Sequence, residues 1–434
     1  MVGCQSETIK IGTLLDKTGD LGNYGPPMEV GADLAITLLT DAGVDIVKVP
    51  GDSGTANQKS IAEATRLIDI EGVSAIVGSL SSGVTMATAT AVTIPKNIPI
   101  MSPASTSPAI STMADNDTVF RSTVSDAAQG VVLARFAWEQ GIKSAGAIYI
   151  NNPYGEGLAN MFSGEFTKLG GTISALVPAE PGQTSYLSEV KKATAGGPDV
   201  LLAMTYPVTA QIYIREAIEG GHASKFMFVD GTKAQDMFDA MTKEHGANFF
   251  DGMYGTAPGA AGSPAKTQFE TLYKEANNGN MPTDPFIAET FDATILLGLA
   301  AVAAQEGSAC DSIKTCLRRI ATDAGDADPE IEPGDIKLAV SMLKKGDDIN
   351  YQGAAGDQEI DANGDVNNTI EVWTIKDGKV TLRGFGSFFV KDKKERMGRN
   401  PKTGEDAVIS ARRVTTFKAS KKFKAKINNG DPHA

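Results

Sequence analysis

The stretch TIKIGTLLDKTGDLGNYGPPMEVGADLAITLLTDAGVDIVKVPGD, residues 8–52, decides the fold class of this chain. It opens with a β-branched run over residues 8–16, continues with a Pro-initiated helical pattern from Gly25, and returns to a β-branched run over residues 44–52. A strand, a helix and a second strand in this order predict a βαβ unit with parallel strands. We therefore expect an α/β protein.

The same alternation continues along the chain and starts afresh after FRSTVSD, residues 120–126. Later strands are predicted in SAGAIYI (144–150), PDVLLAM (198–204) and KFMFVD (225–230). Two such series predict two α/β lobes. Each lobe presents the carboxyl ends of its strands, where open α/β sheets bind ligands.

Length and composition agree with an ordinary folded protein of two or three domains. The chain has 434 residues, of which 41% are hydrophobic and 21% are charged. The longest apolar run, ATILLGLAAVAA at 293–304, is shorter than the roughly 18 residues of a membrane span and is expected to be a buried helix.

Charge is distributed unevenly. Residues 381–434 contain 14 Lys/Arg and 5 Asp/Glu, whereas the other 380 residues contain 26 basic and 48 acidic side chains. An acidic body repels nucleic acid, but a basic tail attracts phosphate.

The three cysteines fall into two groups. Cys4, in VGCQS, resembles the end of a bacterial lipoprotein signal and is expected to carry a lipid anchor; an incidental cysteine is the alternative. Cys310 and Cys316 could pair only if GSAC is still a loop and the helix begins near Asp311. A reduced pair is the other possibility.

Motifs for catalysis are absent from the sequence. It has three histidines and no H-E-x-x-H, C-x-x-C, Walker loop or G-x-G-x-x-G, so we expect no catalytic residue, cofactor or metal. DANGD, residues 361–365, starts like a calcium loop but lacks the downstream glutamate, and we expect a tight Asn-Gly turn there.

Hydroxyl residues stand where predicted strands end and helices begin. Ser81 and Ser82 follow one strand, and Ser105, Thr106 and Ser107 follow the next. Free N–H groups and hydroxyls at such positions suit a carboxylate, although each hydroxyl could also be only a helix cap.

Several segments together resemble the branched-chain amino-acid (Leu/Ile/Val) type periplasmic binding proteins, the solute receptors of ABC importers. They are residues 11–36, AIVGSLSSGVTMA (75–87), IPIMSPASTSPAIS (98–111), FRSTVSDAAQG (120–130), YGEGLA (154–159), PFIAETFDA (285–293) and INYQGAAG (349–356). The resemblance covers about residues 8–380. It implies a two-lobe type I periplasmic binding protein fold.

The resemblance also implies how a zwitterion would be held. Ser82 and Thr106 would meet the ligand carboxylate, with the carbonyl of Ala104 near the ligand ammonium. Asp230, from the other lobe, would neutralise that ammonium. Opposite charges a few ångströms apart in a closing cleft fit a zwitterion, because charge-assisted hydrogen bonds are the strong ones.

Aromatic residues would complete the pocket. The resemblance places Tyr154 over the ligand and Tyr24 at its side chain. Where the family often has an aromatic residue before a proline, this chain has Thr205 followed by Tyr206 and Pro207. We expect this difference to loosen the pocket, so that a polar or larger amino acid, a short peptide or an amide could fit.

The expected domain organisation has three chain exchanges, near Thr123, Tyr254 and Asn350. Residues 1–7 form an anchor or linker, lobe 1 comprises 8–123 and 255–350, lobe 2 comprises 124–254 and 351–380, and residues 381–434 form the tail. The expected protein is a monomeric periplasmic or cell-surface lipoprotein that passes its ligand to an ABC permease in the inner membrane.

The tail resembles the second half of the HU/integration host factor family of DNA-bending proteins, over residues 380–428. GRNPKTGE, residues 398–405, matches the tip of the family's β-arm, so the resemblance makes Pro401 the wedge between base steps. The residues implied to face phosphates are Arg399, Lys402, Arg412, Arg413, Lys421 and Lys424. Without the family's two N-terminal helices, residues 381–434 are expected to form at most a loosely held hairpin and short helix.

Two functions therefore stand side by side. The first is an extracytoplasmic solute-binding protein, with nucleic acid reached only through the tail and then weakly. The alternative is a cytoplasmic DNA-binding regulator that joins a binding-protein-like sensor to a DNA-bending tail. The compartment distinguishes them, because an exported chain does not meet the chromosome.

Overall fold

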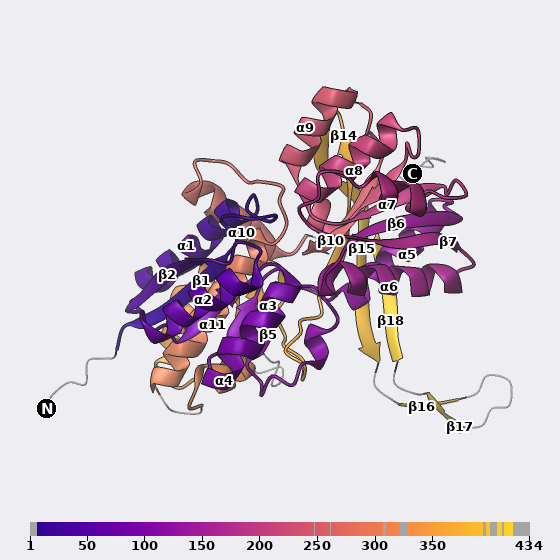
Figure 1. Ribbon diagram of the computed structural model, residues 1–434. Coiled ribbons are helices and arrows are strands. Elements are labelled where there is room, and N and C mark those ends of the chain that lie inside the picture. Colours follow the sequence, from indigo (N-terminus) through magenta and orange to yellow (C-terminus); the bar gives the residue numbers. More distant parts are fainter. Residues whose placement is uncertain are drawn as a thin grey trace, which may run out of the picture.

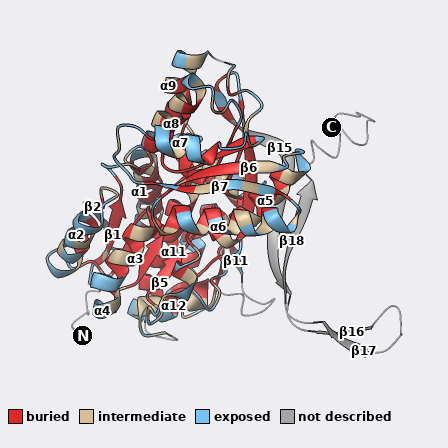
Figure 2. Cartoon of the chain, turned by 45° about the vertical axis from the view of Figure 1, so that its right-hand side comes forward, coloured by how far each residue is buried: buried red, intermediate tan, exposed pale blue. Residues whose placement is uncertain are grey.

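The computed structural model describes residues 7–246, 248–260, 262–306, 310–321, 329–393, 396–399, 406–409 and 412–419. Two α/β lobes lie side by side, each with its own central sheet (Figure 1). Buried residues fill the sheets and the inward faces of the helices that cover them (Figure 2). The expected two-lobe α/β fold is confirmed.

The sheet of lobe 1 has the order β2-β1-β3-β4-β5, with parallel pairing throughout. Its strands are β1 (Ile9–Leu15), β2 (Ile46–Asp52), β3 (Ala75–Gly78), β4 (Ile100–Ser102) and β5 (Val119–Arg121). The strand order reverses between β1 and β3. Such a switch point opens a crevice at the carboxyl ends of the strands, which is where this fold class binds ligands.

Helices from two separate parts of the chain cover this sheet (Figure 1). They are α1 (Gly25–Asp41), α2 (Asn57–Asp69), α3 (Ser82–Thr88), η1 (Ala89–Thr93), α4 (Ile94–Lys96), η2 (Ile110–Thr112), α10 (Pro264–Ala276), α11 (Ile287–Glu306), α12 (Ile313–Ile320), η4 (Pro333–Asp335) and α13 (Ile336–Leu343). Among the described helices, α11 is long and apolar enough to cross a membrane, but 89% of its most apolar window is buried inside the protein. It packs here as a core helix.

The sheet of lobe 2 has eight strands in the order β18-β15-β14-β10-β9-β8-β6-β7. They are β6 (Ser144–Ile150), β7 (Thr172–Ala179), β8 (Val200–Met204), β9 (Phe226–Phe228), β10 (Tyr254–Gly259), β14 (Thr369–Lys376), β15 (Lys379–Lys393) and β18 (Arg412–Ala419). Its helices are α5 (Asp126–Glu139), α6 (Pro153–Lys168), α7 (Leu187–Ala193), α8 (Pro207–Glu219), η3 (Asp230–Thr232) and α9 (Gln235–His245). The strands from β6 to β10 pair in parallel, and those from β10 to β18 pair antiparallel.

The chain passes between the lobes later than expected at two of the three exchanges. β10 pairs with β9 and β14, so the second passage follows Gly259 rather than Tyr254. The third passage, expected at Asn350, follows Asp365, because the carboxyl of Asp365 pairs with the buried guanidinium of Arg121 in lobe 1 at 2.6 Å. The first passage lies between β5 and α5, around Thr123.

Residues 330–357 stay with lobe 1. They form a small sheet of β11 (Glu330–Ile331), β12 (Asn350–Gly353) and β13 (Gly356–Asp357). Asp292 of α11 holds the turn after β12, since its carboxylate accepts hydrogen bonds from Tyr351 Oη at 2.7 Å and from the amides of Ala354 and Ala355 at 2.9 and 2.7 Å. These bonds hold the turn after β12 on lobe 1, so the chain returns to lobe 2 later in the sequence than expected.

The basic tail extends the sheet of lobe 2. A two-residue turn with left-handed backbone at Asp377 (φ 51°) and Gly378 (φ 70°) joins β14 to β15, as in hairpins with an Asp-Gly turn. β15 pairs with β14 from Lys379 to Phe389 and with β18 from Gly386 to Lys393. The expectation of a loosely held hairpin is wrong for β15 and β18. β15 is one continuous strand that pairs with both β14 and β18, so the tail is part of the sheet of lobe 2.

A second hairpin, β16 (Arg396–Arg399) with β17 (Asp406–Ile409), lies beyond the ends of β15 and β18, away from both lobes (Figure 1). The short helix expected after it falls outside the described residues.

Cys310 and Cys316 form a disulfide bond. The helix α12 begins only at Ile313, with Ser312 as its N-cap, so Cys310 lies in a loop and its Cα is 5.2 Å from that of Cys316. Of the two possibilities that the spacing allows, the structure contains the bonded one.

Candidate ligand-binding site

A small cavity of about 20 Å³ lies between the lobes. It is lined by Leu21, Tyr24, Leu80, Ser82, Ala104, Tyr154, Tyr206, Asp230, Gly231 and Phe286. Most of these residues directly follow a strand: β3, β4, β6, β8 or β9. The carboxyl ends of the parallel strands of both lobes therefore meet at one place.

Asp230 is the buried acid of this cavity. Its Oδ1 accepts hydrogen bonds from Gln129 Nε2 at 2.7 Å and from Tyr154 Oη at 3.0 Å. Burial raises its pKa to about 6, although these hydrogen bonds oppose the rise. The next residue has to be a glycine, because a Cβ on Gly231 would lie 2.7 Å from Tyr154 Oη and 2.8 Å from the carbonyl of Thr205.

Ser82 reaches the cavity from the first turn of α3. Its Oγ accepts a hydrogen bond from the amide of Ser107 at 3.1 Å. The hydroxyl proton of Ser82 then remains able to bond to an anion in the cavity. The position agrees with the carboxylate role inferred from the resemblance.

The side chain of Thr106 is used differently from the expectation. It does not line the cavity, and its hydroxyl donates to Asp126 Oδ2 at 2.8 Å. A hydroxyl has one proton to donate, so in this arrangement Thr106 cannot also donate to a ligand carboxylate. Burial and the nearby Asp230 raise the pKa of Asp126 well above its usual range.

Hydrogen bonds join the two lobes around the cavity. Tyr24 Oη of lobe 1 donates to the carbonyl of Gly231 in lobe 2 at 3.2 Å. Tyr206 Oη of lobe 2 donates to Ser81 Oγ in lobe 1 at 3.1 Å. Two further bonds cross between the lobes: Ser107 Oγ to the carbonyl of Pro153, and Asn23 to Asp236. The lobes are therefore closed on each other.

The aromatic wall is tighter than the sequence suggested. Tyr154 and Tyr206 stack with ring centroids 5.7 Å apart and an interplanar angle of 6°. Thr205 turns away from the cavity, and its hydroxyl is 2.9 Å from that of Tyr213. The expectation of a loosened pocket is wrong, because Tyr206 supplies the aromatic surface.

Five of the six residues implied by the resemblance line the cavity, Thr106 being the exception. The sequence interpretation did not assign Leu21, Leu80, Tyr206, Gly231 or Phe286. For Phe286 a signal was available, since PFIAETFDA was one of the matching segments, and for Tyr206 the signal was its position before Pro207.

The implied DNA-contacting residues lie outside this site. Arg399 is in β16, and Arg412 and Arg413 are in β18. Pro401, Lys402, Lys421 and Lys424 fall outside the described residues, as does Cys4.

The described residues include no group of three or more His, Cys, Asp or Glu side chains that could hold a metal. The DANGD segment forms a turn, in which Asp361 Oδ1 accepts from the amides of Asn363 at 2.8 Å and Asp365 at 3.1 Å. The carboxyl of Asp365 is used by Arg121.

Two parallel-sheet lobes, closed on a small cavity at their strand ends, define a two-lobed solute-binding protein. The family model described as periplasmic binding protein matches residues 8–336, and the chain belongs to this family. A second family model, described as bacterial DNA-binding protein, matches residues 364–428. That match starts earlier than the resemblance did and includes β14.

Solved structures of similar fold cover most of the chain. The leucine-binding protein LivK of Thermotoga maritima is 24% identical, with a TM-score of 0.69, covering 86% of this chain and 97% of that one. LivJ of Streptococcus pneumoniae, solved with isoleucine, is 21% identical, with a TM-score of 0.69. The match covers 86% of this chain and 98% of that one. A solute-binding protein of R. palustris, solved with benzoate, is 17% identical, with a TM-score of 0.68 and coverages of 86% and 95%.

Curated relatives of the C-terminal region are integration host factor subunits. Integration host factor subunit alpha of Alteromonas mediterranea is 56% identical over 54 residues, which are 12% of this chain and 54% of that protein. The same subunit of Vibrio vulnificus is 49% identical over 72 residues, which are 15% of this chain and 76% of that protein. The chain thus spans about half to three quarters of the length of these relatives.

Proposed function

We propose that this protein is an extracytoplasmic receptor that closes its two lobes around an amino acid or a similar small zwitterion and delivers it to an ABC permease. The observation that carries the proposal is the chemistry of the closed cavity. Ser82 of lobe 1 and Asp230 of lobe 2 line it together, so a hydroxyl donor and a carboxyl acceptor come from opposite sides. A zwitterion needs one of each.

The buried acid favours amino acids over aromatic acids as the ligand class. Structural neighbours were solved with isoleucine and with benzoate, and fold similarity alone does not choose between them. Asp230 would repel a benzoate, whose only charge is negative, whereas an ammonium group would pair with it.

Ligand entry requires the lobes to separate. The closed cavity has a volume of only about 20 Å³, which is room for about one water molecule, so the lining side chains must rearrange when the lobes close on an amino acid. Opening would break the hydrogen bonds from Tyr24 to Gly231 and from Tyr206 to Ser81, and a bound ligand would favour their return. This is the hinge closure expected of two-lobed receptors.

Calorimetry with a panel of amino acids tests the proposal. Asp230→Asn removes the negative charge but keeps the shape, and should weaken binding by about 2 to 4 kcal/mol because a buried ammonium loses its partner. The control Asp239→Asn removes an exposed carboxylate of α9 in the same lobe and should leave the affinity unchanged. Failure of every amino acid to bind, or equal affinities in Asp230→Asn and wild type, would refute the proposal.

The disulfide supports export. Bonds such as Cys310–Cys316 form and persist in oxidising compartments and are rare in the cytoplasm. We therefore place the protein outside the cytoplasmic membrane, with lipid attachment at Cys4 as part of the proposal. Mass spectrometry of the native N-terminus checks the attachment, and an unmodified cysteine preceded by a cytoplasmic domain would contradict it.

DNA binding is the second candidate function, and the match to bacterial DNA-binding proteins over residues 364–428 favours it. In this chain the arm-like strands extend the sheet of lobe 2. We propose weak binding that depends mainly on phosphate contacts and falls steeply with salt. Gel-shift titration checks this: tight binding that bends DNA at physiological salt and is lost in Pro401→Ala would favour the regulator instead.

A further inference from the structure

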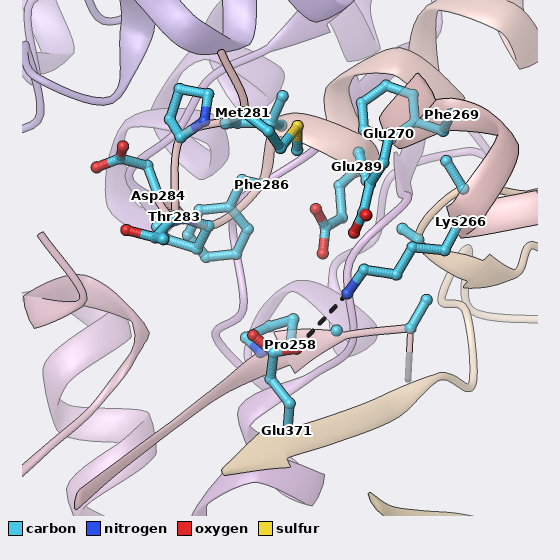
Figure 3. Close-up of a pocket in the computed structure, with 18 of the residues that line it drawn as sticks. Pro258, Lys266, Phe269, Glu270, Met281, Thr283, Asp284, Phe286, Glu289 and Glu371 are labelled. Atoms are coloured by element: carbon cyan, nitrogen blue, oxygen red, sulfur yellow. Dashed lines mark ion pairs between the residues drawn. The ribbon is translucent and has the colours of Figure 1, made fainter. Parts of the chain in front are cut away.

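A second, larger cavity shares Phe286 with the ligand cavity (Figure 3). Its volume is about 380 Å³. Lobe 1 contributes α10, residues 281–289 and the turn at 354–355, and lobe 2 contributes β10, β14 and Lys233. The cavity therefore lies at the junction of the lobes, where the chain passes from β10 to α10.

Part of the wall is apolar, with Pro258, Phe269, Met281 and Phe286 among the lining residues. Phe286 has a left-handed backbone, with φ at 71°, which is unusual for a bulky residue. Phe286 lines both cavities. An occupant of the larger cavity would have a continuous apolar surface on which to rest its own apolar part.

The paired charges of this cavity are centred on Glu371. One of its oxygens is 2.7 Å from Lys233 Nζ. The other is 3.8 Å from Lys266 Nζ, and Figure 3 marks this ion pair. Burial alone would raise the pKa of Glu371, but the two ammonium groups hold it below its usual range. Both lysines and both carboxylate oxygens are thus already used within the protein.

Glu289 is a buried acid of this cavity that forms no ion pair among the described residues. It belongs to the first turn of α11, is only 5% exposed, and its carboxyl points into the cavity (Figure 3). Its carboxyl accepts a hydrogen bond from its own backbone amide, and burial raises its pKa to about 7. A buried carboxyl normally has more partners than this. It is therefore able to accept further hydrogen bonds from a molecule in the cavity.

We propose that this cavity is a second small-molecule site, which takes an organic amine with an apolar body. The protonated nitrogen would pair with Glu289, and the apolar body would lie against Phe269, Met281 and Phe286. A cation is chosen over an anion because Lys233 and Lys266 already pair with Glu371, and the third lysine of the cavity, Lys274, is exposed. The buried Glu289, in contrast, forms no ion pair among the described residues. The site is separate from the cavity that contains Asp230.

Benzylamine is a suitable probe, with benzyl alcohol as its neutral counterpart, and calorimetry on the whole chain measures both. Wild type should bind benzylamine more tightly than benzyl alcohol. Glu289→Gln should weaken benzylamine binding about tenfold or more, as expected when a charge-assisted hydrogen bond is lost. Thr283→Trp, at an exposed position on the cavity rim, should obstruct entry without altering the core.

Two control variants test whether benzylamine binds beside Glu289. Glu270→Gln removes a carboxylate that also lines the cavity but is only half-buried, and it should change the affinity for benzylamine less than about twofold, as for an exposed charge. Asp230→Asn should leave benzylamine binding intact. Equal affinities in wild type and Glu289→Gln, loss in Asp230→Asn alone, or equal binding of the amine and the alcohol would overturn the proposal.

Discussion

Single hydroxyl groups decide how the lobes meet in this protein. Tyr206 uses its hydroxyl twice: it donates to Ser81 of lobe 1 at 3.1 Å and accepts from Asn152 at 3.0 Å. Thr106, in contrast, turns its hydroxyl to Asp126 and away from the cavity. Asp126 begins α5 of lobe 2, so both hydroxyls bond across the lobes, and the residue type alone did not show which of the two side chains lines the cavity.

Tyr206→Phe should weaken ligand binding. It removes the hydrogen bond to Ser81 but keeps the stacked ring, so the closed form loses about 0.5 to 1.5 kcal/mol relative to the open one. Titration calorimetry measures the effect. The matched control is Tyr213→Phe, which removes a buried hydroxyl that bonds to Thr205 within lobe 2 and should lower stability without lowering affinity. Equal losses of affinity in the two variants would contradict the role of Tyr206.

Ligand affinity should rise with pH below neutrality. Burial raises the pKa of Asp230 from 3.8 to about 6, so the ligand-free protein holds a proton there that an ammonium ligand must displace. Affinity should then increase roughly tenfold between about pH 5 and about pH 7 and level off above. Calorimetry across this range checks it, and Asp230→Asn should flatten the profile. Affinity that falls as the pH rises would contradict the proposed partner.

The pH dependence of stability has the opposite sign to the pH dependence of ligand affinity. Between the unfolded pKa of 3.8 and the folded value of about 6, the folded chain holds the proton of Asp230 and the unfolded chain does not. The contribution of this group to stability is therefore present at low pH and is lost as the pH rises through about 6.

At the scale of elements, Ser312 caps the start of α12, and α12 supports the segment at which the chain returns to lobe 2. Arg318 of α12 donates to Asp117 Oδ1 from Nε at 3.1 Å and to the carbonyl of Ala362 at 3.3 Å. The helix thus joins the rim of the first sheet to the turn at residues 361–365. The bond between Cys310 and Cys316 closes the loop that leads into it.

Reduction of the disulfide should lower the free energy of unfolding by about 2 kcal/mol, as expected for a loop with a sequence separation of six. Urea titration with and without reductant measures this. Cys310→Ser is the control, because it lacks the bond under both conditions and its midpoint should not respond to reductant. An unchanged midpoint in the wild type would show that the bond does not contribute.

The strand β15 is the element that unites the two family matches. Its first part completes the hairpin with β14, which α9 supports through Gln235: Gln235 Oε1 accepts from the amide of Val380 at 2.8 Å and Gln235 Nε2 donates to the carbonyl of Gly378 at 3.0 Å. Its second part pairs with β18. A sheet edge is a ready template for another strand, and here the edge is used by the chain's own tail.

At the scale of the whole molecule, the two proposed functions belong to separate parts of the chain. Every residue that lines the ligand cavity precedes Ile287, whereas the match to DNA-binding proteins begins at residue 364. The acidic body and the basic tail also have opposite charge, so the body should repel the DNA that the tail attracts.

A chain that ends at Lys393 should separate these functions. It keeps β15 but lacks β18 and the β16–β17 hairpin, so its ligand affinity should stay within about twofold of the full chain, because distant changes rarely couple. Its DNA binding should be lost. A chain that ends at Lys376 also lacks β15 and should be less stable, with β14 as an exposed edge. Loss of ligand binding in the chain that ends at Lys393 would show that the tail supports the receptor.

The sequence by itself determined the two α/β lobes, the family and five of the six expected cavity residues. Those features follow from local patterns: β-branched runs, Pro-initiated helices, and hydroxyl or acidic residues where strands end, which parallel pairing brings to one edge. The tertiary structure decided the rest. Several features depend on which distant segments become neighbours: the direction of the Thr106 hydroxyl, the bond from Tyr206 to Ser81, the later passages between lobes, the place of β15 in the sheet and the burial of Glu289. A local pattern carries no information on such neighbours, because hydrogen bonds and burial are settled only when the whole chain has folded.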